Sequence, residues 1–258
     1  MRWSDAALLA GALALSGGAA AADTTCDAKV VAALGQQLGI PSLQGAGTKR
    51  HIVAQACKDW PTRAGVHLAT LAYDAGAGAS EQKSLLVAML DKKTLRVLAS
   101  EETEVEEDAA VEFGPNSLKL DTAAYRLNAD VVAFGVRFTS AAHGPSCADY
   151  ASEDELTLFA PNGKDLRTVL HLPMHRMRAL KGCLGSYSPD GAWEDAALTI
   201  GVENSASHGY ADLSLRASIA TGKADEDNAK PPRVERQVVR YDGVRYRAGR
   251  NPPWWLQP

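Results

Sequence analysis

The sequence predicts a mainly β protein, with three consecutive antiparallel meanders after a short helical hairpin at the N-terminus. Apolar and polar residues alternate along 132–138 and again along 212–219. Asn162-Gly163 and Asp242-Gly243 each separate two apolar runs, as the turn of a tight β-hairpin does. Period-two alternation combined with these dipeptides indicates antiparallel strands.

The helical hairpin is expected ahead of the strands. Apolar residues recur at helical spacing from Val30 to Leu38, and Gly39 ends that run. A second helix is expected to begin with Thr48 as its cap and to stop before Pro61. Its apolar residues are Ile52, Val53 and Ala56.

The predicted strands fall into three sets, at roughly 66–121, 131–183 and 196–248. Leu85 to Leu90 is apolar on both faces, which is typical of a central strand covered on two sides. Propeller-like blades and a two-sheet sandwich both fit this pattern. Closed propellers have about 4–8 blades, so three sets leave strand edges that something has to cover.

The first 22 residues have the layout of a secretory signal peptide. Arg2 provides a positive start, residues 6–15 are apolar, and small residues precede Asp23. This apolar run is shorter than the 18 or so residues that a membrane span needs, and no later run is long enough. We therefore expect a periplasmic or secreted chain without a transmembrane segment, with a helical lead at 23–60 and a β domain at 61–258.

Export to an oxidising compartment changes how the four cysteines are interpreted, because an even number of them indicates disulfides. Three connectivities are open. We favour Cys26–Cys57 and Cys147–Cys183, since each pair brackets a segment with its own local structure. No two cysteines have the close spacing of a zinc site.

One loop resembles a known repeat. The stretch from Asn204 to Leu213 is similar to the D-x-N-x-D-G-x-x-D-L loop of FG-GAP (VCBS-type) β-propeller repeats, and Gly209, Asp212 and Leu213 match it. In that family the acidic loop binds calcium. Here the upstream ligand positions are Asn204, Ala206 and His208. Only one of these can supply an oxygen, whereas calcium takes six to eight, so we expect the turn without the metal.

Two further segments, 57–61 and 241–246, are similar to parts of uncharacterised exported bacterial proteins. This resemblance implies an exported, mostly β protein and adds no chemistry.

No catalytic motif stands out, and no catalytic residue is assigned. The chain lacks a G-x-S-x-G elbow, a P-loop and a dinucleotide fingerprint. His171 and His175 are four residues apart, which on a strand is about 13 Å, so without a bulge they are too far apart to share a metal ion. We expect no cofactor and no metal. With 27 basic residues against 31 acidic ones, nucleic acid is also a poor candidate as a partner.

Charge and aromatic residues are unevenly distributed. Residues 101–160 hold thirteen acids and three bases, whereas 231–258 hold six arginines and two acids. The chain ends with a pair of tryptophans that either fold back as a plug on the core or anchor a partner, because Trp and Arg are enriched in binding hot spots. The binding hypothesis comprises Trp254, Trp255, Arg245, Arg247 and Arg250.

These observations favour an exported, disulfide-stabilised, non-catalytic module that binds an envelope or secreted protein, as an inhibitor, an immunity protein or an accessory subunit. Two alternatives stay open. One is a hydrolase of cell-wall or surface polymers that uses carboxylates from the acidic region as acid and base. The other is a structural module that assembles with itself through open strand edges.

Overall fold

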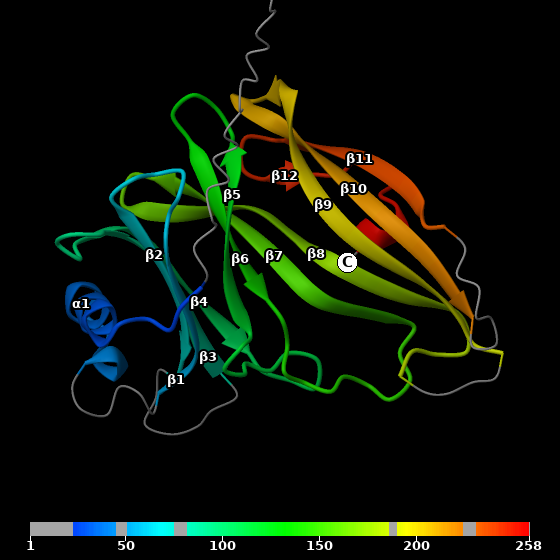
Figure 1. Cartoon of the computed structure of the whole chain (residues 1–258), viewed down its shortest axis with the longest axis horizontal. Coiled ribbons are helices and arrows are strands. Elements are labelled where there is room, and N and C mark those ends of the chain that lie inside the picture. Colours follow the sequence, from blue (N-terminus) through cyan, green and yellow to red (C-terminus); the bar gives the residue numbers. More distant parts are fainter. Residues whose placement is uncertain (1–22, 45–50, 75–81, 186–189, 224–230, 258) are drawn as a thin grey trace, which may run out of the picture.

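A computed structural model describes residues 23–44, 51–74, 82–185, 190–223 and 231–257 of the 258-residue chain. In these residues α1 (Ala28–Leu38) and the 3₁₀ helices η1 (Pro41–Leu43) and η3 (Trp254–Leu256) accompany a 12-stranded sheet (Figure 1). The strands are β1 (Ile52–Asp59), β2 (Val66–Tyr73), β3 (Gln82–Asp91), β4 (Val97–Glu106), β5 (Leu118–Arg126), β6 (Val132–Phe138), β7 (Tyr150–Asn162), β8 (Asp165–Lys181), β9 (Ala192–Ser207), β10 (Tyr210–Lys223), β11 (Arg233–Tyr241) and β12 (Tyr246–Arg247).

The expected signal peptide at 1–22 and the expected helix cap at Thr48 lie outside the described residues. None of the helices in the described ranges is long and apolar enough to cross a membrane.

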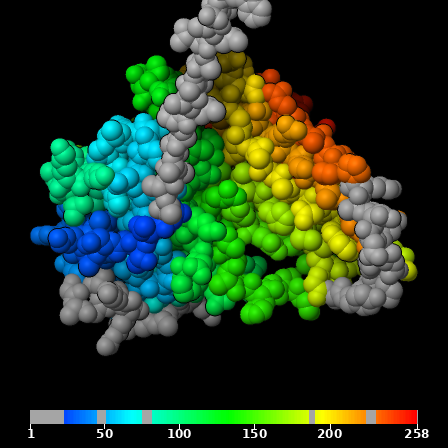
Figure 2. Space-filling view, viewed as in Figure 1, coloured from blue at the N-terminus to red at the C-terminus, as the bar shows by residue number. Residues whose placement is uncertain are grey.

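The fold is mainly β and is built of antiparallel meanders, as predicted. The sheet does not close on itself into a barrel or propeller. β1–β4, β5–β8 and β8–β12 each pair in chain order, so β8 belongs to two meanders. At its start, β8 also makes one parallel contact with β4, between Asp165 and Ser100. Its residues from His175 to Lys181 pair with β9 along the same edge. β8 therefore joins all three groups of strands, which follow one another across the surface from cyan through green to orange in Figure 2.

The predicted first helix is confirmed. Asp27 caps α1 by accepting a hydrogen bond of 2.8 Å from the backbone of Lys29, and Gly39 ends it in the left-handed conformation, at φ 70°. The buried face of α1 packs with η1 on one face of β2 and β3. A side chain at Gly35 would come within 2.6 Å of the Leu43 carbonyl oxygen, so this glycine lets η1 lie close against the helix.

The predicted second helix is wrong: residues 52–59 form β1, which pairs with β2. The short apolar run that contains Ile52, Val53 and Ala56 fits either period, because a helix and a two-faced strand both place these residues toward a core. In the structure Ala54 and Ala56 face one core cluster, whereas Cys57 faces the other. Hydrogen bonding to β2 along the segment favours a strand over a helix. For such short segments the tertiary context often determines the secondary structure.

Several strand predictions are confirmed. The alternating stretches form β6 and β10, and Leu213, Leu215, Ala217 and Ile219 of β10 are buried in one cluster. Asn162-Gly163 and Asp242-Gly243 form turns, with φ of 70° and 97° at the two glycines. The run from Leu85 to Leu90 lies in β3 and is covered on both faces, by α1 and η1 on one side and by β5 and β6 on the other.

The predicted boundary of the first strand set is wrong. β5, which we placed with the strands from residue 66 onward, pairs with β6 and belongs to the second meander. This register sets Leu118 opposite Phe138 and Leu120 opposite Val136. Such apolar cross-strand pairs stabilise a sheet, and the glutamate-rich β4 offers β5 no equivalent. The meanders consequently share one branched sheet instead of forming separate blades.

Both favoured disulfides are present. Cys26–Cys57 ties the residues before α1 to β1, with 4.9 Å between the Cα atoms, and Thr24 pairs with Cys57 through two backbone hydrogen bonds. Cys147–Cys183 ties the approach to β7 to the end of β8, with a Cα separation of 5.0 Å. The first bridge is buried, whereas Cys147 is exposed.

Removing each bridge by paired alanine substitution should destabilise the fold unequally. The two loops enclose 31 and 36 residues, so the entropic contribution is similar, at about 2–4 kcal/mol each. The Cys26→Ala, Cys57→Ala variant also loses core packing and should therefore lose more unfolding free energy than Cys147→Ala, Cys183→Ala. Urea unfolding measures this difference. An equal loss in the two variants would contradict it.

Candidate functional site

The residues after β11 form a strap that folds back onto the sheet. This C-terminal strap, residues 242–257, contains β12 and η3. Trp254 is 8% exposed and Trp255 is 0% exposed, and both belong to the cluster that β7–β11 enclose. The indole Nε1 of Trp255 donates a hydrogen bond of 2.7 Å to the carboxylate of Glu235 on β11. The structure thus places both tryptophans as a plug, which is one of the two alternatives that the sequence offered.

The strap has an inner and an outer face. Tyr246 is buried and its hydroxyl donates a 2.6 Å hydrogen bond to the carbonyl oxygen of Ala211. Arg245 and Arg247 alternate with it and are exposed, as is Arg250. These arginines are the members of the predicted binding set that a macromolecule can reach, because the tryptophan side chains lie inside.

Asp242 holds the turn from which this alternation starts. Its carboxylate accepts hydrogen bonds from the backbone of Val244 and Arg245, at 2.9 and 2.8 Å. It also pairs with the guanidinium of Arg247 at 2.5 Å. Hydrogen bonds from Arg245 and Arg247 keep the pKa of Asp242 well below its ordinary range. Asp242 thus fixes the backbone of the turn and the guanidinium of Arg247.

The acidic stretch makes its own contacts elsewhere. Residues 101–106 lie on β4, and among the described strands the outer edge of β4 is paired only at Ser100. Glu107 forms an ion pair of 2.8 Å with the buried Lys83, which also pairs with Asp74 at 3.0 Å. Glu102 accepts a hydrogen bond from Tyr73. The contacts of Glu102 and Glu107 thus stay within the first meander and its adjoining residues, whereas Arg247 of the strap pairs with Asp242.

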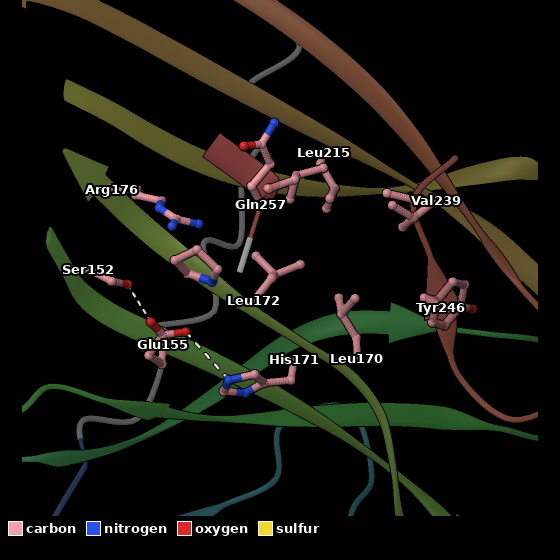
Figure 3. A pocket seen from close by; sticks show the side chains of 13 residues that line it. Ser152, Glu155, Leu170, His171, Leu172, Arg176, Leu215, Val239, Tyr246 and Gln257 are labelled. Carbon is pink, nitrogen blue, oxygen red and sulfur yellow. Dashed lines mark hydrogen bonds and ion pairs between the residues drawn. The ribbon is translucent and has the colours of Figure 1, made fainter. Parts of the chain in front are cut away.

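A cavity of about 450 Å³ lies between β8 and the inner face of the strap. Eight of its lining residues are apolar or aromatic, namely Leu170, Leu172, Pro173, Leu215, Val239, Tyr246, Ala248 and Leu256. The polar ones are Ser152, Glu155, His171, Arg176 and Gln257. Figure 3 shows Arg176, Ser152 and Glu155 at one end of the cavity, and Val239 and Tyr246 at the other. The lining is therefore divided into a polar and an apolar end.

Pro173 stands where β8 bends along this cavity. It has no backbone N–H to donate, and the register between β7 and β8 shifts at Asp154 and Glu155 opposite it. The ladder is regular again from Pro173 to Leu170, so Leu170 and Leu172 alternate with His171 and Pro173 along β8, and all four residues line the cavity.

The polar end does not have the order of a serine hydrolase relay. Ser152 donates its hydroxyl hydrogen bond to Glu155, and the other carboxylate oxygen of Glu155 is 3.6 Å from Nε2 of His171. Nδ1 of His171 is 3.0 Å from the hydroxyl of Thr157. In the catalytic arrangement the histidine stands between the serine and the carboxylate, so that it can take the serine proton. Here the carboxylate stands between the other two groups.

Arg176 gives this end a buried positive charge. It is 8% exposed, and its guanidinium carbon is 5.4 Å from the ring centre of Tyr150. Arg178, two residues further on the same face of β8, stacks on Trp254 at 4.5 Å. Arg178 also forms an ion pair of 2.7 Å with Glu194 of β9, and Arg233 of β11 pairs with the same carboxylate. Glu194 thereby connects three strands beside the strap.

Sequence reasoning missed this arginine pair, although the alternation along β8 contains the signal. Leu172 and Met174 are core residues, and Arg176 and Arg178 follow them at the same parity. In a strand such parity places all four residues on one face unless a bulge intervenes. When a row of core-facing apolar residues continues along the same strand as arginines, the arginines are expected to be buried. A buried charge usually has a functional or structural partner.

The loop that resembles the FG-GAP repeat forms the turn between β9 and β10. His208 and Gly209 have φ of 49° and 87°, and Asp212 is buried with its carboxylate accepting a hydrogen bond of 2.7 Å from Ser205. Hydrogen bonds from Ser207 and Ser205 lower the pKa of Asp212. Asp212 therefore stabilises the hairpin in the structure. The described part of the chain contains no group of three or more His, Cys, Asp or Glu side chains suited to a metal ion.

Comparisons with protein-family models, with curated proteins and with solved structures find no match to this chain.

Replacing Trp255 tests the plug. Trp255→Ala should lower the free energy of unfolding by about 3–5 kcal/mol, because it empties a fully buried site. Trp255→Phe keeps most of the apolar volume and loses the hydrogen bond to Glu235, which costs about 1 kcal/mol. Urea unfolding of both variants measures the two terms. Similar losses in both would show that the indole volume is not what the core needs.

Glu194 should make the free energy of unfolding depend on pH in the acidic range. Burial alone would raise its pKa, but hydrogen bonds and ion pairing with Arg233 and Arg178 outweigh this and hold the pKa below the ordinary 4.5. The stabilisation is therefore complete above pH 4.5 and is lost as the pH falls through the lowered pKa of the folded state. Urea unfolding over an acidic pH series should show a steeper loss for the wild type than for Glu194→Gln. Parallel curves would contradict this assignment.

Proposed function

We propose that this chain is an exported, non-catalytic binding protein that presents the arginines of its C-terminal strap to an acidic surface of an envelope or secreted protein. The observation that carries the proposal is the alternation along the strap. Tyr246 is anchored in the core, whereas Arg245 and Arg247 on either side of it are exposed. A basic row held on a rigid support offers a partner charge-assisted contacts with little loss of conformational entropy.

The disulfides support a place outside the cytoplasm. Both bridges have Cα separations within the range of ordinary disulfides, and such bonds persist mainly in oxidising compartments. The periplasm and the exterior of the cell are the compartments that fit. Either would bring the protein into contact with envelope proteins.

The geometry of the cavity favours binding over hydrolysis. Glu155 is the one carboxylate among the described lining residues, whereas glycoside hydrolysis by the usual route needs two carboxylates across the substrate. Ser152 and His171 both face Glu155 and not each other. The polar end is thus better suited to holding a ligand than to transferring a proton to or from one.

Cross-linking and affinity purification from an envelope fraction test the proposal, with mass spectrometry of the captured proteins. The test variant is Arg245→Gln, Arg247→Gln, Arg250→Gln. A matched control, Arg96→Gln, Arg126→Gln, Arg216→Gln, removes the same charge from exposed positions outside the strap. Wild type and control should capture the same acidic protein, more weakly at high salt because surface charge is screened. The strap variant should capture at least tenfold less of it.

Three results would overturn the proposal. The strap variant could capture the partner as well as the control does, or no partner could be found. Recovery of this protein alone, with a sedimentation coefficient that rises with concentration, would favour the self-assembling module instead. Circular dichroism of each variant shows whether the fold has survived.

A further inference from the structure

The cavity beneath the strap is a second candidate site, separate from the exposed arginines. We propose that it binds a single-chain amphiphile with an anionic head group, with the alkyl chain at the apolar end and the head group at Arg176. This goes beyond the proposed protein-binding function and does not depend on it. Three features carry the inference: the division of the lining, the charge at its polar end and the volume.

The apolar end draws its side chains from four elements. Leu215 comes from β10, Val239 from β11, Tyr246 from β12 and Leu256 from η3, and they face Leu170 and Leu172 of β8 (Figure 3). Apolar side chains from two opposed walls can surround an alkyl chain and remove it from water. This is the main source of affinity for such ligands.

Arg176 is the group at the polar end that can bind an anionic head group, whereas the carboxylate of Glu155 at the same end accepts a hydrogen bond from Ser152. Among the described lining residues Arg176 carries the permanent positive charge, and it is 8% exposed. A guanidinium has five N–H donors, so it can bind a carboxylate or phosphate in addition to the contacts that it already makes. The other titratable groups that face this end are Glu155 and His171. Ser152 donates a hydrogen bond to Glu155, and the His171 side chain, which is 62% exposed, lies 3.6 Å from its carboxylate.

The volume limits the ligand to a small molecule. At about 450 Å³ the cavity lies within the range of about 300–1,000 Å³ that ligand sites occupy. Leu256 and Gln257 close one side of it, so the strap that carries the outer arginines also forms a wall of the cavity. A medium-length alkyl carboxylate matches both the size and the division of the lining.

Isothermal titration calorimetry of the whole mature chain, with its disulfides intact, tests the proposal. The probes are octanoate, decanoate and dodecanoate, with decyltrimethylammonium as the cationic counterpart of decanoate, all below their micellar concentrations. Each added methylene should lower Kd about fourfold until the apolar end is full. Decyltrimethylammonium should bind at least tenfold more weakly than decanoate.

Two variants locate the site. Arg176→Gln should weaken decanoate binding at least tenfold, whereas Arg216→Gln, which removes an exposed arginine from the outer face of β10, should leave it unchanged. Because loss of a buried charge can disturb the fold, Ala248→Leu is the second variant. It adds volume at a half-buried lining position, so it should abolish dodecanoate binding without lowering the free energy of unfolding.

Several outcomes would overturn the inference. The first is that none of the carboxylates gives a heat of binding, and the second is that decyltrimethylammonium binds as tightly as decanoate. The third is that Kd does not change with the length of the alkyl chain, and the fourth is that both cavity variants bind as the wild type does. The strap variant Arg245→Gln, Arg247→Gln, Arg250→Gln separates the two proposals. If it loses its protein partner but still binds decanoate, both hold. If an envelope protein is captured and decanoate does not bind, only the cavity proposal fails.

Discussion

The long strand β8 is the element on which the rest of the structure depends. Its 17 residues pair with β7 along one edge and with β4 and then β9 along the other. Between the contacts at Asp165 and His175, that second edge pairs with none of the described strands, and the strap packs against β8 in the same core cluster. Pro173 has no N–H to donate to the ladder, and the register between β7 and β8 shifts next to it, between Asp154 and Glu155. β8 therefore connects all three groups of strands and also contributes one wall of the cavity.

The C-terminal strap packs against β8 and contributes to the core cluster beside it. Trp255 contributes a fully buried indole to the cluster enclosed by β7–β11, and its N–H is satisfied by Glu235. Arg178 stacks on Trp254 while its guanidinium pairs with Glu194, so the aromatic and ionic contacts hold the same segment. Because these contacts involve β8, β9 and β11 together, the position of the strap depends on the whole C-terminal half of the sheet. A segment held in this way can carry side chains on both faces at defined positions.

The sequence predicts which face a residue occupies better than which strand lies beside it. The alternation along 212–219, the turn at Asn162-Gly163 and both disulfides follow from local patterns and simple bracketing. The pairing of β5 with β6 and the strand at 52–59 do not, because register over long sequence separations is decided by tertiary packing. For the site, Trp254 and Trp255 are recognisable as unusual, but only the fold shows that they point inward and that Arg176 shares a cavity with Leu215.

The acidic outer edge of β4 bears on how the protein behaves when concentrated. An unpaired strand edge is a template on which another chain can add, and among the described residues this edge is paired only at Ser100. Glu102, Glu104 and Glu106 are exposed along it. A second copy that paired its own β4 there in antiparallel fashion would bring glutamates close to glutamates, and like charges directly opposite are destabilising. The glutamates therefore disfavour the pairing of two β4 edges, which would continue the open sheet of one molecule into the next.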